Sequence, residues 1–131
     1  MGHGVLAYHH LSLSVTDLSR SEQWYQSVLG LETVAEIERE NFRRIRLRDP
    51  GSGVTLTLTA HREQSNAPFD ERSAGMDHVA FLVDNGSMLA FKERLEQLNI
   101  DHSPIKTSSG GGVMITLRDP DNIQLELFAD S

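Results

Sequence analysis

Hydrophobic and polar residues alternate along several short stretches of the chain, which predicts β-strands with one buried and one polar face. Two other segments follow the helical period instead: Trp24, Tyr25 and Val28 share one face, and Met88, Phe91, Leu95 and Leu98 share another. The expected order is a strand, a helix and three strands, and then the same order again. The expected strands span residues 8–15, 31–37, 41–48, 54–59, 77–83, 100–105, 113–118 and 123–128.

The two halves also share short sequence motifs. Leu47-Arg-Asp-Pro50 returns as Leu117-Arg-Asp-Pro120, and the stretch from His10 to Val15 has its counterpart from His78 to Val83. Matches in the same order and at nearly the same offset indicate a duplicated unit. With one extra residue in the first turn, the alignment places Thr57 of the first half where Glu126 stands in the second.

Length and composition predict a single domain, residues 1–131, of the α+β class. Its modules would span about 7–60 and 76–129, joined by the polar linker 61–75. The net charge of -7 argues against nucleic acid or an anionic membrane as partner. No apolar run is long enough to span a membrane, and a cytoplasmic location is expected. Because the chain has no cysteine, any metal ligands must be histidines and carboxylates.

The polar faces of the expected strands carry the candidate metal ligands. His10 lies on the polar face of the first strand, and His78 occupies the equivalent place in the second half. Glu126 stands in the middle of the last strand, where glutamate is disfavoured. Two imidazoles and one carboxylate match the donor set of a 2-His-1-carboxylate metal site with open positions. The pattern therefore predicts His10, His78 and Glu126 as ligands.

Other polar-face residues are candidates for catalysis and substrate binding. Arg44 and Arg46 could clamp an anionic substrate, or could be ordinary solvated charges. His61 could act as an acid or base near the ion, or could be a plain linker histidine. His9, on the apolar side of its strand, is expected in the core. Further substrate contacts are expected from Thr57, Gln124 and Phe128.

The chain resembles the vicinal oxygen chelate superfamily in three features. These are the tandem plan, the two His-x-x-x-x-Val strand openings and the Asp-Pro-Asp-x-x-x-x-Glu ending. This superfamily includes glyoxalase I, fosfomycin-resistance transferases, bleomycin-binding proteins and extradiol dioxygenases. The resemblance covers residues from about 8 to 128. It implies a curved, cup-shaped mixed sheet with helices on its outer face, and a divalent ion (Fe, Mn, Ni, Zn or Co) held by His10, His78 and Glu126. It also implies modules paired in a homodimer.

Thr57 departs from the family pattern, because glyoxalase-like and epimerase-like members have a Glu or Gln ligand at that position. We expect a metal-dependent glyoxalase-like enzyme, a lyase, isomerase or transferase. Its ion would chelate a small oxygen-bearing substrate and stabilise an enolate or alkoxide, with Glu126 and His61 as catalytic residues. One alternative is a metal-free drug-binding resistance protein of the same fold. Another is a small iron-dependent extradiol-type dioxygenase, although the chain has no Glu-Tyr-Gly ending.

Overall fold

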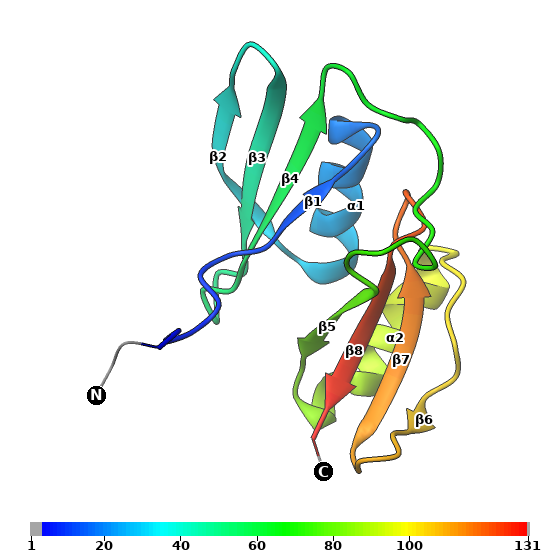
Figure 1. Ribbon diagram of the computed structural model, residues 1–131. Helices are drawn as coiled ribbons and strands as arrows, with labels where there is room; N and C mark the ends of the chain where they lie inside the picture. The colour runs from blue at the N-terminus through cyan, green and yellow to red at the C-terminus, as the bar shows by residue number, and fades with distance from the viewer. Residues whose placement is uncertain (1–3, 131) are drawn as a thin grey trace. The chain divides into compact units, whose positions relative to one another are not determined.

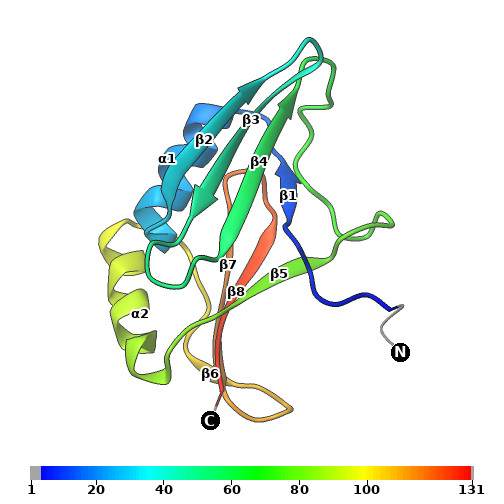
Figure 2. The same ribbon diagram turned by 90° about the vertical axis from the view of Figure 1, so that its left-hand side faces the viewer.

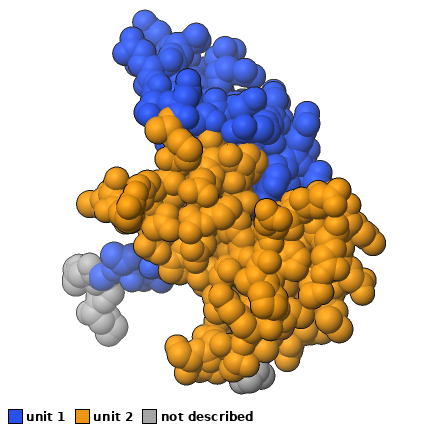
Figure 3. Space-filling view, turned by 90° about the vertical axis from the view of Figure 1, so that its right-hand side faces the viewer, with its two compact units in different colours: residues 1–66 blue, residues 67–131 orange. Residues whose placement is uncertain are grey.

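The computed structural model describes residues 4–130 and divides the chain into two compact units, Met1–Asn66 and Ala67–Ser131 (Figures 1 and 3). Each unit consists of a four-stranded mixed sheet and one α-helix, in the order strand, helix, three strands. This confirms the α+β class and the tandem βαβββ plan. The boundary between the units falls inside the expected linker.

The first unit contains β1 (Ser12–Ser14), α1 (Leu18–Leu29), β2 (Glu32–Glu38), β3 (Phe42–Arg48) and β4 (Thr55–His61). Its strands lie in the order β1-β4-β3-β2, and only β1 and β4 are parallel. The helix covers one face of this sheet (Figure 2). The alternation predicted from sequence places the apolar side chains on that face, where those fully or almost fully buried include Leu13, Val15, Ile45, Leu47, Leu56 and Leu58.

Both ends of α1 have a local chemical cause. The Asp17 side chain accepts a hydrogen bond from the main-chain N–H of Arg20 at 3.0 Å, so Asp17 caps the helix. At the other end, Gly30 adopts a left-handed conformation with φ 70° and donates its N–H to Gln26. The buried face of the helix consists of Leu18, Ser21, Tyr25 and Val28.

The second unit contains β5 (His78–Leu82), a short 3-10 helix η1 (Asn85–Ser87), α2 (Met88–Gln97), β6 (Lys106–Thr107), β7 (Val113–Arg118) and β8 (Gln124–Ala129). Its strands lie in the order β5-β8-β7-β6, with β5 and β8 parallel. The helix α2 lies on one face of the sheet (Figure 1). The core below it includes Met88, Leu95, Ile115, Leu117, Leu125 and Leu127.

The expected strand at 100–105 is wrong. Only His102 forms an isolated bridge, with Leu117, and β6 is two residues long. The Ser103 hydroxyl accepts the main-chain N–H of Thr116 at 2.9 Å, so a side chain takes the place of a ladder carbonyl. Pro104 follows and has no N–H to donate to a ladder. These two residues interrupt the strand that alternation predicted.

The first strand is also shorter than predicted. It begins at Ser12 rather than Tyr8, and His10 therefore lies in the extended segment before it. The segment is exposed: Val5, Leu6 and Tyr8 keep 96%, 94% and 103% of their surface accessible. The expectation that His9 packs in the core is wrong, because His9 is exposed. The physical reason is that β1 is an edge strand, paired only with β4.

Strand register confirms the alignment of the two halves. Arg46 pairs with Thr57 in the first sheet, as Thr116 pairs with Glu126 in the second. The parallel pairs agree, since Ser12 faces Thr57 and Ala80 faces Glu126. Thr57 and Glu126 therefore occupy equivalent places. No helix within residues 4–130 is long and apolar enough to cross a membrane.

Candidate metal centre

His78 and Glu126 lie on the polar face of the second sheet, on the neighbouring strands β5 and β8. The distance from His78 Nε2 to Glu126 Oε2 is 3.7 Å. Two donor atoms that each lie about 2.1 Å from one ion are at most about 4.2 Å apart, so this pair is close enough to share an ion. The imidazole is 41% exposed and the carboxylate 15% exposed, so a ligand can reach the pair from solvent.

Asp77 orients the imidazole of His78. The distance from His78 Nδ1 to the Asp77 carboxylate is 2.8 Å. Because an ionised carboxylate only accepts, Nδ1 is the donor, and the neutral ring has its lone pair on Nε2, the nitrogen nearer Glu126. The hydrogen bond to Asp77 raises the pKa of His78, and the charges of Glu126 and Asp77 raise it further, while partial burial opposes them.

Glu126 is also held by Gln124, through the same oxygen that lies near His78. The Gln124 amide donates to Glu126 Oε2 at 3.2 Å, and its oxygen accepts from Arg118 at 3.2 Å. Each candidate ligand in this unit thus has a polar neighbour: Asp77 contacts His78, and Gln124 contacts Glu126. Such supporting contacts are typical of residues that bind metal ions.

His10 belongs to the first unit, whereas His78 and Glu126 belong to the second. His10 is exposed, and its Nδ1 lies 2.8 Å from Nδ1 of His9, so one ring donates to the other. Among residues 4–130, no group of three or more histidine and acidic side chains gathers closely enough to enclose an ion. The assignment of His10, His78 and Glu126 to one ion stays a prediction.

The polar face of the first sheet carries Thr57 and the two arginines. Thr57 is 3% exposed, and its hydroxyl has no hydrogen-bond partner within the described part of the chain. Arg44 donates to Thr59 at 2.8 Å, and its guanidinium lies 4.3 Å from the centre of the Phe42 ring. Arg46 is exposed beside Thr57. The face therefore offers an unpaired hydroxyl and positive charge.

Two other predicted site residues lie further along these strands. His61 is exposed at the end of β4, with the centre of its ring 6.3 Å from that of Phe42. Its main-chain N–H donates to the Gln64 side chain. Phe128 is half-buried on the polar face of β8, opposite Leu82 of β5 and Met114 of β7. The roles of His61 and Phe128 stay predictions.

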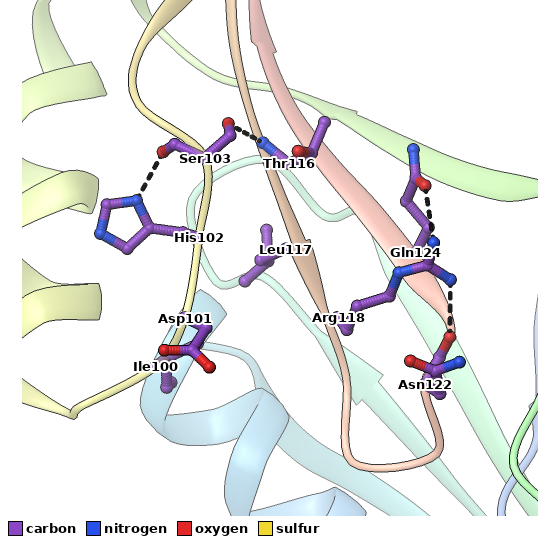
Figure 4. Close-up of a pocket in the computed structure, with 9 residues that line it drawn as sticks. All are labelled: Ile100, Asp101, His102, Ser103, Thr116, Leu117, Arg118, Asn122 and Gln124. Atoms are coloured by element: carbon purple, nitrogen blue, oxygen red, sulfur yellow. Dashed lines mark hydrogen bonds between the residues drawn. The ribbon is translucent and has the colours of Figure 1, made fainter.

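A pocket of about 620 Å³ opens in the second unit beside this face (Figure 4). Gln124 and Arg118 form one side, and His102 and Ser103 the other. Neither His78 nor Glu126 lines the pocket, which reaches their neighbourhood only through Gln124. We therefore take the pair of donor atoms, and not this pocket, as the centre of the candidate site.

Sequence reasoning missed three residues of this region. Asp77 was visible as the acidic neighbour of His78, and Arg118 as part of the Leu-Arg-Asp-Pro repeat. Glu71 gave no signal, because it stands in a linker without periodicity. In the structure it accepts two hydrogen bonds from Arg118, at 3.1 and 2.8 Å.

Comparison with known proteins shows what the chain is similar to. The chain is 27% identical to a lactoylglutathione lyase of Escherichia coli O157:H7 over 123 residues, 92% of this chain and 90% of the relative. A glyoxylase/bleomycin resistance protein/dioxygenase domain from Frankia sp. EAN1pec superimposes with a TM-score of 0.89 at 28% identity, covering 98% of this chain and 100% of that domain.

A more distant structure shares the fold. It is the E126Q mutant of the fosfomycin resistance protein FosX from Listeria monocytogenes, complexed with Mn(II) and 1S,2S-dihydroxypropylphosphonic acid. Its TM-score is 0.74 at 20% identity, over 98% of this chain and 93% of that one. The sequence profile of the Glyoxalase/Bleomycin resistance protein/Dioxygenase superfamily matches residues 7–127. The chain belongs to this superfamily.

Proposed function

We propose that the protein is a metal-dependent enzyme of glyoxalase type, acting on a small substrate that binds through two oxygens. The observation that carries this proposal is the pair His78 and Glu126, with donor atoms 3.7 Å apart and a carboxylate on His78 Nδ1. His10 is the proposed third ligand, because it is the repeat equivalent of His78. When bound, a divalent ion supplies Lewis acidity toward the oxygens of the substrate.

The residues around the pair have separable roles in this proposal. Asp77 holds the imidazole of His78 in the tautomer that offers Nε2, and Gln124 holds one oxygen of Glu126. The other oxygen of Glu126 is then available as a general base toward an acidic C–H or O–H of the substrate. His61 is a second proposed acid or base, at the end of β4.

The first unit would supply the contacts that select the substrate. The Thr57 hydroxyl is buried without a partner among residues 4–130, and a substrate oxygen would satisfy it. Arg46 is exposed on the same face, and Arg44 is fixed by Thr59 and Phe42. This positive charge favours a substrate with an anionic group. Phe128 is proposed to contact its apolar part.

We also propose a homodimer in which His10 of one chain joins His78 and Glu126 of the other. The reason is that the three proposed ligands are divided between the two compact units. Sedimentation velocity with and without Mn²⁺ tests this directly, and a dimer is expected. A monomer that retains the ion would contradict the shared site and would require both units of one chain to supply the ligands.

Metal binding is the first test of the proposed function. Mn²⁺ is the probe, because the FosX complex contains that ion. We expect chelator competition to show one bound ion per chain, and expect His78→Ala and Glu126→Ala each to weaken binding by at least ~100-fold, since each removes a charge or donor that the ion requires. His10→Ala should weaken it as well.

A histidine variant serves as a matched control. His102→Ala changes a histidine in the same unit as His78 that contacts Ser103 instead. It should bind Mn²⁺ like the wild type. Equal binding by the wild type and all three ligand variants would overturn the proposal and favour a metal-free binding protein.

A further inference from the structure

A chain of side-chain hydrogen bonds connects the segment before β5 with Glu126. Glu71 contacts Arg118, Arg118 contacts Gln124, and Gln124 contacts Glu126. The four residues come from three parts of the second unit. Glu71 lies in the segment before β5, Arg118 at the end of β7, and Gln124 and Glu126 in β8. Figure 4 shows the middle of this chain, where Arg118 lies against Gln124 and Asn122.

The guanidinium of Arg118 is fixed by three acceptors. Its two terminal nitrogens donate to the two oxygens of Glu71 at 3.1 and 2.8 Å. One nitrogen also donates to the main-chain carbonyl of Asn122 at 3.0 Å. A bidentate contact to a carboxylate restricts both the position and the plane of the fork. Arg118 therefore presents the second N–H of Nη2 to Gln124 in a set direction.

Arg118 also decides which way the Gln124 amide points. A guanidinium has only donors, so it requires the amide oxygen, and an ionised carboxylate has only acceptors, so Glu126 requires the amide NH₂. Only one of the two amide orientations satisfies both neighbours, and this is the orientation found, at 3.2 Å on each side. Without Arg118 the amide could reverse and present its oxygen to the carboxylate.

The same connection is missing from the first half of the repeat. Arg48 faces Thr55 there, as Arg118 faces Gln124, and Thr57 stands at the place of Glu126. The arginine is thus common to both halves, but the amide and the carboxylate are present only in the second. The hydrogen bonds from the arginine to the amide and from the amide to the carboxylate therefore belong to the half that contains Glu126, and are not a general feature of the repeat.

We propose that Arg118 and Gln124 are positioning residues for Glu126, and that Glu71 fixes Arg118 for this purpose. The inference rests on the proposed function, because it assigns a role in holding the ligand Glu126. The amide restrains Oε2 of Glu126, the same oxygen that lies 3.7 Å from His78 Nε2. Loss of either positioning residue should leave the backbone of β8 in place but allow the carboxylate of Glu126 to rotate.

Metal affinity tests the proposal with two near-isosteric variants. Arg118→Met removes the fork, and Gln124→Met removes the amide, while both keep the apolar length of the side chain. Each should weaken Mn²⁺ binding by ~10-fold or more, the effect typical of outer contacts on metal ligands. Arg72→Met is the control: it removes the same charge from an arginine that bonds to Asp70 in the same segment, and it should bind like the wild type.

A second measurement does not depend on metal. In the wild type the side-chain amide of Gln124 should give a restrained ¹⁵N–¹H₂ signal in NMR spectra, and in Arg118→Met that signal should become mobile while the backbone spectrum remains folded. Arg72→Met should leave it unchanged. An unchanged Gln124 signal in Arg118→Met would overturn the positioning role.

The two measurements separate the possible failures. If Glu126→Ala abolishes Mn²⁺ binding but Arg118→Met and Gln124→Met bind like the wild type, the positioning role is wrong and the proposed function stands. If the wild type binds no Mn²⁺, the proposed function is wrong, and with it the role toward a metal ligand. A mobile Gln124 signal in Arg118→Met would then show that Arg118 orients the amide without serving an ion.

Discussion

Two threonines on the same face of β4 are in opposite hydrogen-bonding states. Thr57 and Thr59 are 3% and 2% exposed. The hydroxyl of Thr59 contacts Ser12 at 2.9 Å and accepts from Arg44 at 2.8 Å, whereas no residue in the described part of the chain bonds to the hydroxyl of Thr57. A buried hydroxyl without a partner costs free energy, and natural proteins retain few of them. The hydroxyl of Thr57 is thus a hydrogen-bonding group that no residue in the described part of the chain satisfies.

Replacing each threonine by valine should therefore change stability in opposite directions. Thr57→Val removes an unsatisfied hydroxyl at constant shape and should raise the free energy of unfolding by roughly 1 kcal/mol. Thr59→Val removes the hydrogen bonds to Arg44 and Ser12 and should lower it by roughly 1 kcal/mol. Urea denaturation of both variants measures this. Destabilisation in both would mean that the Thr57 hydroxyl is bonded in the folded protein.

At the scale of single residues, sequence patterns located candidate ligands but not the groups that support them. Alternation placed Glu126 on a polar strand face, and the repeat paired His78 with His10; the structure brings His78 and Glu126 together. Alternation does not predict the contact between Arg118 and Glu71, because that contact depends on how the segment before β5 packs. Contacts across an aperiodic segment leave no periodic signal in the sequence.

At the scale of secondary structure, sequence predicted which elements exist better than where they end. The strand patterns at 113–118 and 123–128 correspond to β7 and β8 within a residue. In the turn between them, the Asp119 side chain accepts the main-chain N–H groups of Asp121 and Ile123. The errors at 8–11 and 100–105 lie beside an edge strand or a proline, where pairing partners and not propensity determine the strand length.

The glycine-rich loop before β7 provides a test at this scale. Gly112 has φ 78°, and a Cβ there would lie 2.4 Å from the carbonyl oxygen of Ala129. Gly111 has φ 97°, but a Cβ there would meet no atom within 4 Å. Gly111→Ala should lose about 1 kcal/mol of stability through backbone strain alone. Gly112→Ala should lose a further 1–3 kcal/mol or so, because the overlap forces β8 to move.

Thermal unfolding of the two alanine variants gives the comparison. Because both positions have positive φ, the difference between them isolates the steric contact with Ala129. Equal losses would mean that the loop moves away without cost and that Gly112 is not held against the end of β8.

At the scale of the whole molecule, the two units have kept one plan and diverged in their polar faces. Registers match between the sheets, yet Glu126 faces Thr116 where Thr57 faces Arg46. The first unit thus presents hydroxyl groups and positive charge, and the second a carboxylate, an amide and an imidazole. Sequence could establish the duplication because the motifs repeat in order. Sequence could not establish the different roles of the two polar faces, since those roles depend on side-chain partners within each unit.

The response of the fold to acid should depend on Glu71. The hydrogen bond from Arg118 lowers the pKa of Glu71 from 4.5 to about 2, and the main-chain hydrogen bond and the charge of Arg118 act in the same direction. A carboxyl with a lower pKa in the folded than in the unfolded state stabilises the fold fully above its unfolded pKa. That stabilisation is lost as the pH falls from about 4.5 to about 2.

Glu71→Gln should therefore be less stable than the wild type near neutral pH, and the difference should shrink as the pH falls below about 4.5 and vanish near 2. Both partners are partly exposed, with side chains 30% and 40% accessible, so high salt should also reduce the difference. Urea denaturation at a series of pH values measures it, with Glu63→Gln, an exposed loop glutamate of the other unit, as the control for losing one negative charge. If the gap between Glu71→Gln and the wild type stayed constant throughout the acid range, the ion pair with Arg118 would not stabilise the fold, and Arg118 would have to be oriented by its contacts with Asn122 and Gln124.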